Sequence, residues 1–213
     1  MKVVIFQLSL FGINTYLVYD PATLYCAVID PGMIEEREEK AISDYISKNN
    51  LKLTNIINTH LHIDHIAGNH YLQLKYNVPV SAHLLDEPLG NRIQQQAAMF
   101  GMKEQIPNVE ITEYLKAGDI VKIGKGSLKV IPVPGHSQGS IALYDEKDGF
   151  VIVGDALFKG SIGRTDLPGG NYEQLIASIR NNLFTLPDNT VVYSGHGLPT
   201  TIGEEKQTNP FLQ

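Results

Sequence analysis

Three of the seven histidines fall within six residues, and this short stretch constrains the chain more than any other feature. In the stretch Asn58–Gly68, His60, His62 and His65 surround Asp64. Neutral imidazole is the commonest protein ligand for metals, and carboxylate oxygen binds the same cations. The spacings of two and three residues cannot share one helix face, unlike the four-residue spacing of a zincin helix. We therefore expect an irregular loop that offers side chains to metal ions.

The cluster lies between a predicted strand over residues 53–57 and a predicted helix over residues 68–76, where the backbone can bring several side chains together. We expect His60 and His62 to bind one ion, and Asp64 and His65 to face another. A tetrahedral site needs about four ligands, so this loop alone cannot complete two sites. Further ligands must come from elsewhere in the chain.

Three later residues, His136, Asp155 and His196, meet this requirement. Each lies just after a predicted apolar strand and beside glycine, which permits tight turns and a close approach of the backbone. One histidine in such a position would more often be structural, but three strand-end residues beside the first cluster indicate ligands. The candidate metal ligands are therefore His60, His62, Asp64, His65, His136, Asp155 and His196.

Size and charge limit what the chain can bind. Its 213 residues, 43% hydrophobic and 19% charged, suit a single soluble domain over residues 1–213. A formal net charge of −6 opposes nucleic-acid binding, which needs a basic face. No apolar run approaches the about 18 residues of a membrane span, so we expect a cytoplasmic protein without a membrane partner. The lone Cys26 excludes an internal disulfide and thiolate-rich zinc sites.

The order of predicted elements indicates the fold class. Strands open the chain, helices and strands surround the histidine cluster, and further strands, one helix and a last strand follow. Two packed sheets with helices outside both explain this order better than strict alternation of strand and helix. The predicted strands are 3–8, 14–19, 25–30, 53–57, 78–82, 120–123, 127–133, 139–145, 150–153 and 190–193, and the predicted helices are 35–48, 68–76 and 171–186.

The seven candidate ligands resemble the metallo-β-lactamase superfamily, which has a His-x-His-x-Asp-His motif followed by single His, Asp and His ligands. All seven positions occur in order, and the resemblance covers nearly the whole chain. It implies an α+β fold, a four-layer αββα sandwich, with a two-metal site at one edge. It also implies that Asp30, at the end of an early strand, supports the ligand loop. The implied first-metal ligands are His60, His62 and His136, the second-metal ligands are Asp64, His65 and His196, and Asp155 bridges the two.

The same resemblance implies metal-assisted hydrolysis. Two divalent ions would lie about 3.5–4 Å apart and share a hydroxide whose pKa is lowered towards about 7. We expect Zn²⁺, with Fe or Mn as the alternatives. That hydroxide is the expected nucleophile, and Asp64 is expected to orient it while binding a metal. No separate general acid is evident, which suits a leaving group that departs as an anion, such as a thiolate with a pKa near about 8.5.

The stretch 158–166 looks like the glyoxalase II (hydroxyacylglutathione hydrolase) group, and the chain's end resembles the short, single-domain type. This similarity implies hydrolysis of a small-molecule thioester, with Arg164 contacting the thiol part. The other interpretation of Arg164 is a surface pair with Asp166, which is worth little by itself. Asp166 and Leu198 stand where the full-length group has tyrosines, so the thiol need not be glutathione. The sequence does not indicate an oligomeric state.

Other functions stay open at this point. The persulfide dioxygenase group shares the Gly163–Asp166 stretch but uses one iron, which would take His60, His136 and Asp155 here. Loss of a ligand would have favoured a non-catalytic metal-binding module, and no ligand is lost. The fold alone is compatible with a β-lactamase or phosphodiesterase role, but the Gly163–Asp166 stretch points elsewhere.

Residues 85–106 are expected to form a helical excursion, with Ile93, Ala97 and Phe100 along one stripe. This segment is either a lid over the metal site or a surface excursion, and we favour the lid. Of the leftover histidines, His70 is expected to be structural or exposed, and His83 to be structural rather than to line the pocket.

Overall fold

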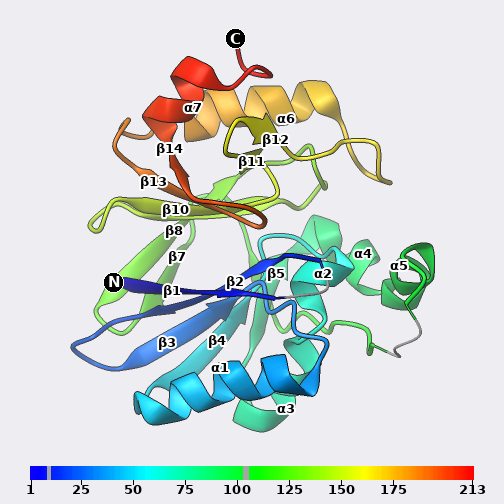
Figure 1. Cartoon of the computed structure of the whole chain (residues 1–213), viewed down its shortest axis with the longest axis vertical. Coiled ribbons are helices and arrows are strands. Elements are labelled where there is room, and N and C mark those ends of the chain that lie inside the picture. The colour runs from blue at the N-terminus through cyan, green and yellow to red at the C-terminus, as the bar shows by residue number, and fades with distance from the viewer. Residues whose placement is uncertain (9–10, 103–105) are drawn as a thin grey trace.

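The computed structural model describes residues 1–8, 11–102 and 106–213. Two six-stranded sheets form its centre, and helices cover their outer faces (Figure 1). Helices α1 (Glu36–Lys48) and α3 (Asn69–Tyr76) lie on one side, whereas α6 (Tyr172–Ser178) and α7 (Ile202–Thr208) lie on the other. The expected four-layer αββα sandwich is therefore confirmed. Within the described ranges, no helix combines the length and apolar character needed to cross a bilayer.

The first sheet brings the predicted ligand loop to one edge. Its strand order is β1-β2-β3-β4-β5-β6, antiparallel from β1 to β3 and parallel from β3 to β6. The carboxyl ends of β3 and β4 therefore meet at the same edge, where Asp30 and the histidine cluster follow them. The strands are β1 (Lys2–Gln7), β2 (Asn14–Tyr19), β3 (Tyr25–Ile29), β4 (Lys52–Ile57), β5 (Val80–His83) and β6 (Glu113–Leu115).

The second sheet brings three more chain segments to that edge. Its order is β14-β13-β10-β9-β8-β7, in which β10 and β13 are parallel and β9 is antiparallel to both β8 and β10. Strands β8, β10 and β13 thus run in one direction and end together. The strands are β7 (Ile120–Ile123), β8 (Gly126–Pro132), β9 (Ile141–Asp145), β10 (Phe150–Gly154), β13 (Val191–Ser194) and β14 (Thr200–Thr201), and a separate hairpin joins β11 (Leu157–Phe158) to β12 (Ser161–Ile162).

Alternation along the strands fills the spaces between the four layers. In β3, Cys26 and Val28 face the helix-covered side, whereas Ala27 and Ile29 face the second sheet. Strand β10 repeats this division between the inter-sheet core and the core under α6 and α7. Burial raises the pKa of the Cys26 thiol to about 12, which agrees with a small hydrophobic side chain in the core.

Local details differ from the sequence-based expectations. The predicted irregular loop contains one helical turn, α2 (Ile63–Ile66), because four residues are too few to show a helical period in the sequence. The predicted helix over 171–186 is α6 followed by a wider turn over Ile179–Leu183. Strands β6, β11, β12 and β14 were not predicted, since two or three residues are too few to show an alternation, and helix α7 was not predicted either.

The segment predicted as a lid consists of short helices beside α2. These are a 3-10 turn over Leu84–Asp86, α4 (Glu87–Gly90) and α5 (Ile93–Met99), while residues 103–105 lie outside the described residues. Ile93 and Ala97 are buried as expected, but the prediction for Phe100 is wrong, because its side chain is 48% exposed. Helix α5 ends before Phe100, whose ring packs on Phe11 at 5.6 Å between centroids. A lid movement stays a prediction.

Candidate metal centre

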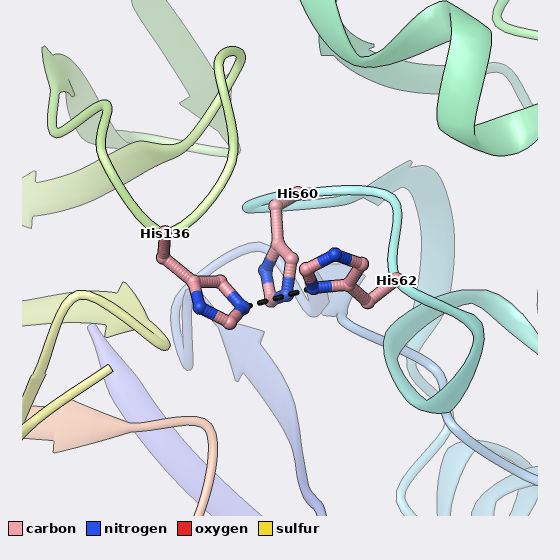
Figure 2. Close-up of side chains that lie close together, drawn as sticks. All are labelled: His60, His62 and His136. Atoms are coloured by element: carbon pink, nitrogen blue, oxygen red, sulfur yellow. Dashed lines mark hydrogen bonds between the residues drawn. The ribbon is translucent and has the colours of Figure 1, made fainter. Parts of the chain in front are cut away.

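The seven predicted ligands come together where the two sheets end. His60 and His62 precede α2, which contains Asp64 and His65, while the remaining ligands follow β8, β10 and β13. Figure 2 shows the rings of His60, His62 and His136 turned toward one another, although His136 comes from the other sheet. The fold therefore gathers side chains that are up to 136 residues apart in the sequence.

The ligand atoms form two groups with Asp155 between them. In each group, one nitrogen or oxygen per residue lies within 4.8 Å of the others. Asp155 Oδ1 is 3.3 Å from His65 Nε2, and its Oδ2 is 3.7 Å from His136 Nε2, so this carboxylate reaches both groups. The members of one group are His60, His62 and His136, and those of the other are Asp64, His65 and His196.

The separations of these atoms fit metal coordination. Ligand atoms on a tetrahedron with bonds of about 2.1 Å stand about 3.4 Å apart. His62 Nδ1 is 2.9 Å from His136 Nε2, and His196 Nε2 is 3.1 Å from Asp64 Oδ2 and 3.6 Å from Asp155 Oδ2. The donor atoms are thus already near the separations that a bound ion imposes.

Hydrogen bonds on the outer side of two rings fix which ring nitrogen carries the proton. His136 Nδ1 donates to the Arg164 carbonyl at 2.7 Å, and a carbonyl can only accept. The Thr59 hydroxyl donates to Asp30 at 2.7 Å, so it accepts from His60 Nδ1 at 3.1 Å. In both rings the proton sits on Nδ1 and the lone pair of Nε2 faces the site, as metal binding requires.

Asp30 lies beneath the ligand loop and binds it. Its Oδ1 accepts from the Thr59 N–H at 2.7 Å, and its Oδ2 accepts from the Thr59 hydroxyl at 2.7 Å and from His65 Nδ1 at 2.9 Å. An oxygen of Asp30 also lies within 4.8 Å of nitrogens of His60 and His65. Because both oxygens already accept hydrogen bonds, we favour the supporting role over a ligand role.

Three buried polar atoms at the centre of the site have no hydrogen-bond partner among the described residues: His60 Nε2, His65 Nε2 and Asp155 Oδ1. Leaving one such atom unpaired costs about 1–3 kcal/mol. All three belong to predicted ligands, and a bound cation would satisfy them together. The residues present therefore fit metal ions, on the grounds of geometry, donor chemistry and unpaired buried atoms.

Electrostatics keep several ligands in the form that binds metal. Burial, and then the neighbouring His136, lower the pKa of His62 to about 4. Burial also lowers the pKa of His60 well below its usual range. Burial alone would raise the pKa of Asp155, but His65 outweighs it and the pKa is lowered. His60 and His62 are thus neutral and Asp155 is ionised at neutral pH, whereas the carboxylates around His65, Asp155 first, outweigh burial and raise the pKa of that ring.

Two glycines around His196 are required by the geometry. A Cβ on Gly195 would overlap Asp155 Oδ1 and His65 Cε1, so a larger residue would enter the site. Gly197 has a φ of 78°, which side chains other than glycine rarely adopt. The expectation that glycine lets the backbone approach a crowded site is confirmed here.

Sequence reasoning missed Asp86, which is 1% exposed. Its Oδ2 accepts from the Leu61 N–H at 3.1 Å and from the Ser137 hydroxyl at 2.7 Å, and its Oδ1 accepts from the Gly139 N–H at 2.6 Å. One carboxylate thereby joins the loop of the first two histidines to the turn that carries His136. Its sequence context, a segment interpreted as a lid, contained no signal for this role.

A cavity of ≈ 410 Å³ opens on the site. The Arg164 side chain lines it but also forms a two-point pair with Asp166, with both nitrogen–oxygen distances 2.7 Å. The structure thus contains the surface pair, and substrate contact by Arg164 stays a prediction. Besides candidate ligands, the lining residues are Phe100, Phe158, Ser161, Ile162, Arg164 and Leu167.

The leftover histidines lie outside this cavity. His83 Nδ1 accepts from the Leu85 N–H at 3.2 Å and caps the turn that follows β5, as the structural interpretation predicts. His70 is exposed on α3 and lines a different cavity together with Glu39 of α1.

Removal of metal is expected to lower the melting temperature. An ion at about 1,000 times its Kd stabilises a protein by about 4 kcal/mol, and about 1 kcal/mol shifts the Tm of a chain of this size by about 2–4 °C. We therefore expect chelator-treated protein to melt about 10 °C lower in scanning fluorimetry and zinc to restore the Tm. Magnesium, which prefers six oxygen ligands, serves as the control. An unchanged Tm after complete metal removal would contradict occupancy of this buried site.

Comparison with known proteins gives consistent matches over most of the chain. Residues 8–196 match the family described as the metallo-beta-lactamase superfamily. The chain is 34% identical over 217 residues to hydroxyacylglutathione hydrolase GloC of Haemophilus influenzae, and the alignment covers 100% of this chain and 98% of that protein.

Solved structures with the same fold include three that cover nearly all of this chain. BLEG-1 B3 metallo-beta-lactamase is 32% identical with a TM-score of 0.90, covering 100% of both chains. TTHA1623 in a di-iron-bound form is 35% identical with a TM-score of 0.88, covering 99% of this chain and 100% of that one. ETHE1 from Myxococcus xanthus is 30% identical with a TM-score of 0.81, covering 99% of this chain and 84% of that one.

Proposed function

The chain belongs to the metallo-β-lactamase superfamily, and on this premise we propose that it is a metal-dependent hydrolase of thioesters. The observation that carries the proposal is a cavity lined by five of the seven candidate ligands and, among the described residues, by no other carboxylic acid or imidazole that could donate a proton. Among the described lining residues outside that set, Ser161 and Arg164 are the polar ones. A thiolate, with a thiol pKa near about 8.5, departs without a proton, whereas an amine or alkoxide needs one. The name of the Haemophilus relative, a hydroxyacylglutathione hydrolase, supports the same substrate class.

We propose two Zn²⁺ ions as the cofactors, because imidazole and carboxylate are typical zinc ligands. When bound, such ions lower the pKa of a water towards about 7 and withdraw charge from the substrate's carbonyl oxygen. The assignment gives His60, His62 and His136 to one ion, Asp64, His65 and His196 to the other, and Asp155 to both.

The chain's own groups then orient the reactants. Asp64, which hydrogen-bonds to His196 at the cavity, accepts a hydrogen bond from the attacking water and fixes its direction. The water oxygen bonds to the carbonyl carbon, the carbon–sulfur bond breaks, and the sulfur leaves as a thiolate. The protons of the water pass to solvent. Arg164, when released from Asp166, would contact the thiol part of the substrate.

The choice of leaving group provides the test. Purified protein is expected to hydrolyse S-lactoylglutathione or another thioester at least about 100-fold faster, in kcat/KM, than the amide of the same acid. Absorbance of the thioester bond and release of free thiol measure the reaction. Faster turnover of the amide, or of a β-lactam, would contradict a thioesterase.

A second candidate is a mononuclear-iron dioxygenase that acts on persulfides. Its support is the likeness to ETHE1. The likeness to TTHA1623, solved in a di-iron-bound form, supports iron as the metal but not the number of ions. Here His60, His136 and Asp155 would hold one iron. Metal analysis of protein purified without added metal separates the candidates. About two zinc ions per chain favour the hydrolase, and about one iron with oxygen consumption on a persulfide favours the dioxygenase.

A further inference from the structure

A second, smaller cavity adjoins the one at the metal centre. It has a volume of ≈ 110 Å³ and lies between α5 and the Leu167–Pro168 segment. Both cavities are lined by His62, Phe100 and Leu167, so they lie side by side. A molecule held at the metal centre can therefore extend into the smaller cavity.

The walls of this cavity are largely apolar. Leu89, Met99, Phe100, Leu167 and Pro168 contribute to them. Met99 is 66% exposed and Phe100 is 48% exposed, which is unusual for large apolar side chains clustered beside a site. Exposed apolar side chains gathered at a pocket typically mark a surface that a ligand covers.

Gln96 is the buried polar residue of the lining besides the candidate ligand His62. Its side-chain amide forms its hydrogen bonds with the backbone around the cavity. Gln96 Oε1 accepts from the Ile63 N–H at 3.0 Å, and its Nε2 donates to the carbonyls of Leu61 at 3.1 Å and Leu89 at 2.9 Å. Gln96 therefore ties α5 to the ligand loop and presents no free donor to the cavity. The other polar lining residues, Arg92 and Gln95, are exposed to solvent.

We propose that this cavity receives an unbranched apolar chain of the thioester substrate, a proposal that rests on the thioesterase function above. An apolar cavity of about 150 Å³ holds benzene, so ≈ 110 Å³ accommodates about four carbon atoms. The chain belongs either to the acyl half or to the thiol half of the thioester. An alkyl chain is equally apolar in either half, and the experiment below distinguishes the two.

Two series of thioesters test the proposal. One varies the acyl chain from acetyl to hexanoyl on N-acetylcysteamine, and the other varies the thiol from methanethiol to hexanethiol on acetyl. In one series, kcat/KM should rise about fourfold for each added methylene until about four carbons are buried, and then level off. A flat profile in both series, with hydrolysis otherwise intact, would overturn the pocket and leave the thioesterase standing.

A blocked variant and a matched control separate the pocket from general effects. Gln95→Trp places a large ring at the cavity, whereas Ala98→Trp places the same ring at an exposed position of α5 outside the lining. Gln95→Trp should abolish the chain-length preference, so that its kcat/KM values for the shortest and the longest thioester agree within about twofold. Ala98→Trp should keep the preference. Retention of the full preference in Gln95→Trp would overturn the assignment.

Binding without turnover keeps the two proposals distinguishable. S-pentylcysteine, a thioether that cannot be hydrolysed, should bind at least about tenfold more tightly than S-methylcysteine in calorimetry, and Gln95→Trp should remove the difference. If no thioester is hydrolysed but this difference is present, the pocket stands and the thioesterase function fails. Equal affinities of the native protein for both thioethers would overturn the pocket.

Discussion

Asp155→Asn is expected to lose most of the bound metal and to hydrolyse thioesters at least about 1,000-fold more slowly than the native protein. The expectation follows from the position of this carboxylate, whose oxygens lie 3.3 Å from His65 Nε2, 3.6 Å from His196 Nε2 and 3.7 Å from His136 Nε2. The amide keeps the shape but removes the negative charge and replaces one acceptor with a donor. Both proposed metal positions would therefore lose the ligand that is assigned to both.

The measurement is metal content by elemental analysis, together with thioester turnover at saturating zinc. Asp44→Asn is the matched control, because Asp44 pairs with Lys40 on the outer surface of α1, where such a pair is worth little. The control should retain native metal content and turnover. Two tightly bound ions in Asp155→Asn, with turnover near native, would show that Asp155 does not bridge the sites.

The candidate ligands could be found in the sequence because each carries metal-binding chemistry and lies in a segment that follows a predicted strand. His136 and His196 follow β8 and β13, and the rule that parallel strands end at one edge places them together once the sheet order is known. The approach of the two sheets to one another was not predictable from the sequence alone. It depends on contacts between segments more than one hundred residues apart, such as the bond from the Asn14 N–H to the Gly195 carbonyl.

The supporting contacts could not be predicted, because many of them use the main chain. His136 Nδ1 donates to the carbonyl of Arg164, and any residue at that position would supply the same carbonyl. Phe100 followed the helical spacing of Ile93 and Ala97, yet it lies beyond the end of α5 and faces the cavity. Spacing predicts a buried face only while the helix continues.

Asp86 offers the sharper test of how the site is assembled. Asp86→Asn preserves the side-chain volume, so we expect the variant to fold. The new NH₂ group would face an N–H or O–H donor that hydrogen-bonds to the carboxylate in the native protein. Leaving such donors unpaired should lower the free energy of unfolding by about 1–3 kcal/mol. A loss of stability alone would indicate only a structural role.

Metal affinity distinguishes positioning from stability. Asp86 holds the loop of His60 and His62 against the turn of His136, whereas Asp30 holds His65 of the other group. We therefore expect Asp86→Asn to lower the zinc affinity of the three-histidine group by about 10–100-fold and to change the affinity of the other group little. Stepwise zinc competition measures both affinities. Asp119→Asn is the control and should change neither step, because the Asp119 side chain accepts a hydrogen bond from the Lys116 N–H, away from the metal centre. An equal loss of zinc affinity at both groups would contradict positioning by Asp86. Its three hydrogen bonds go to Leu61, Ser137 and Gly139, beside the ligands of the three-histidine group.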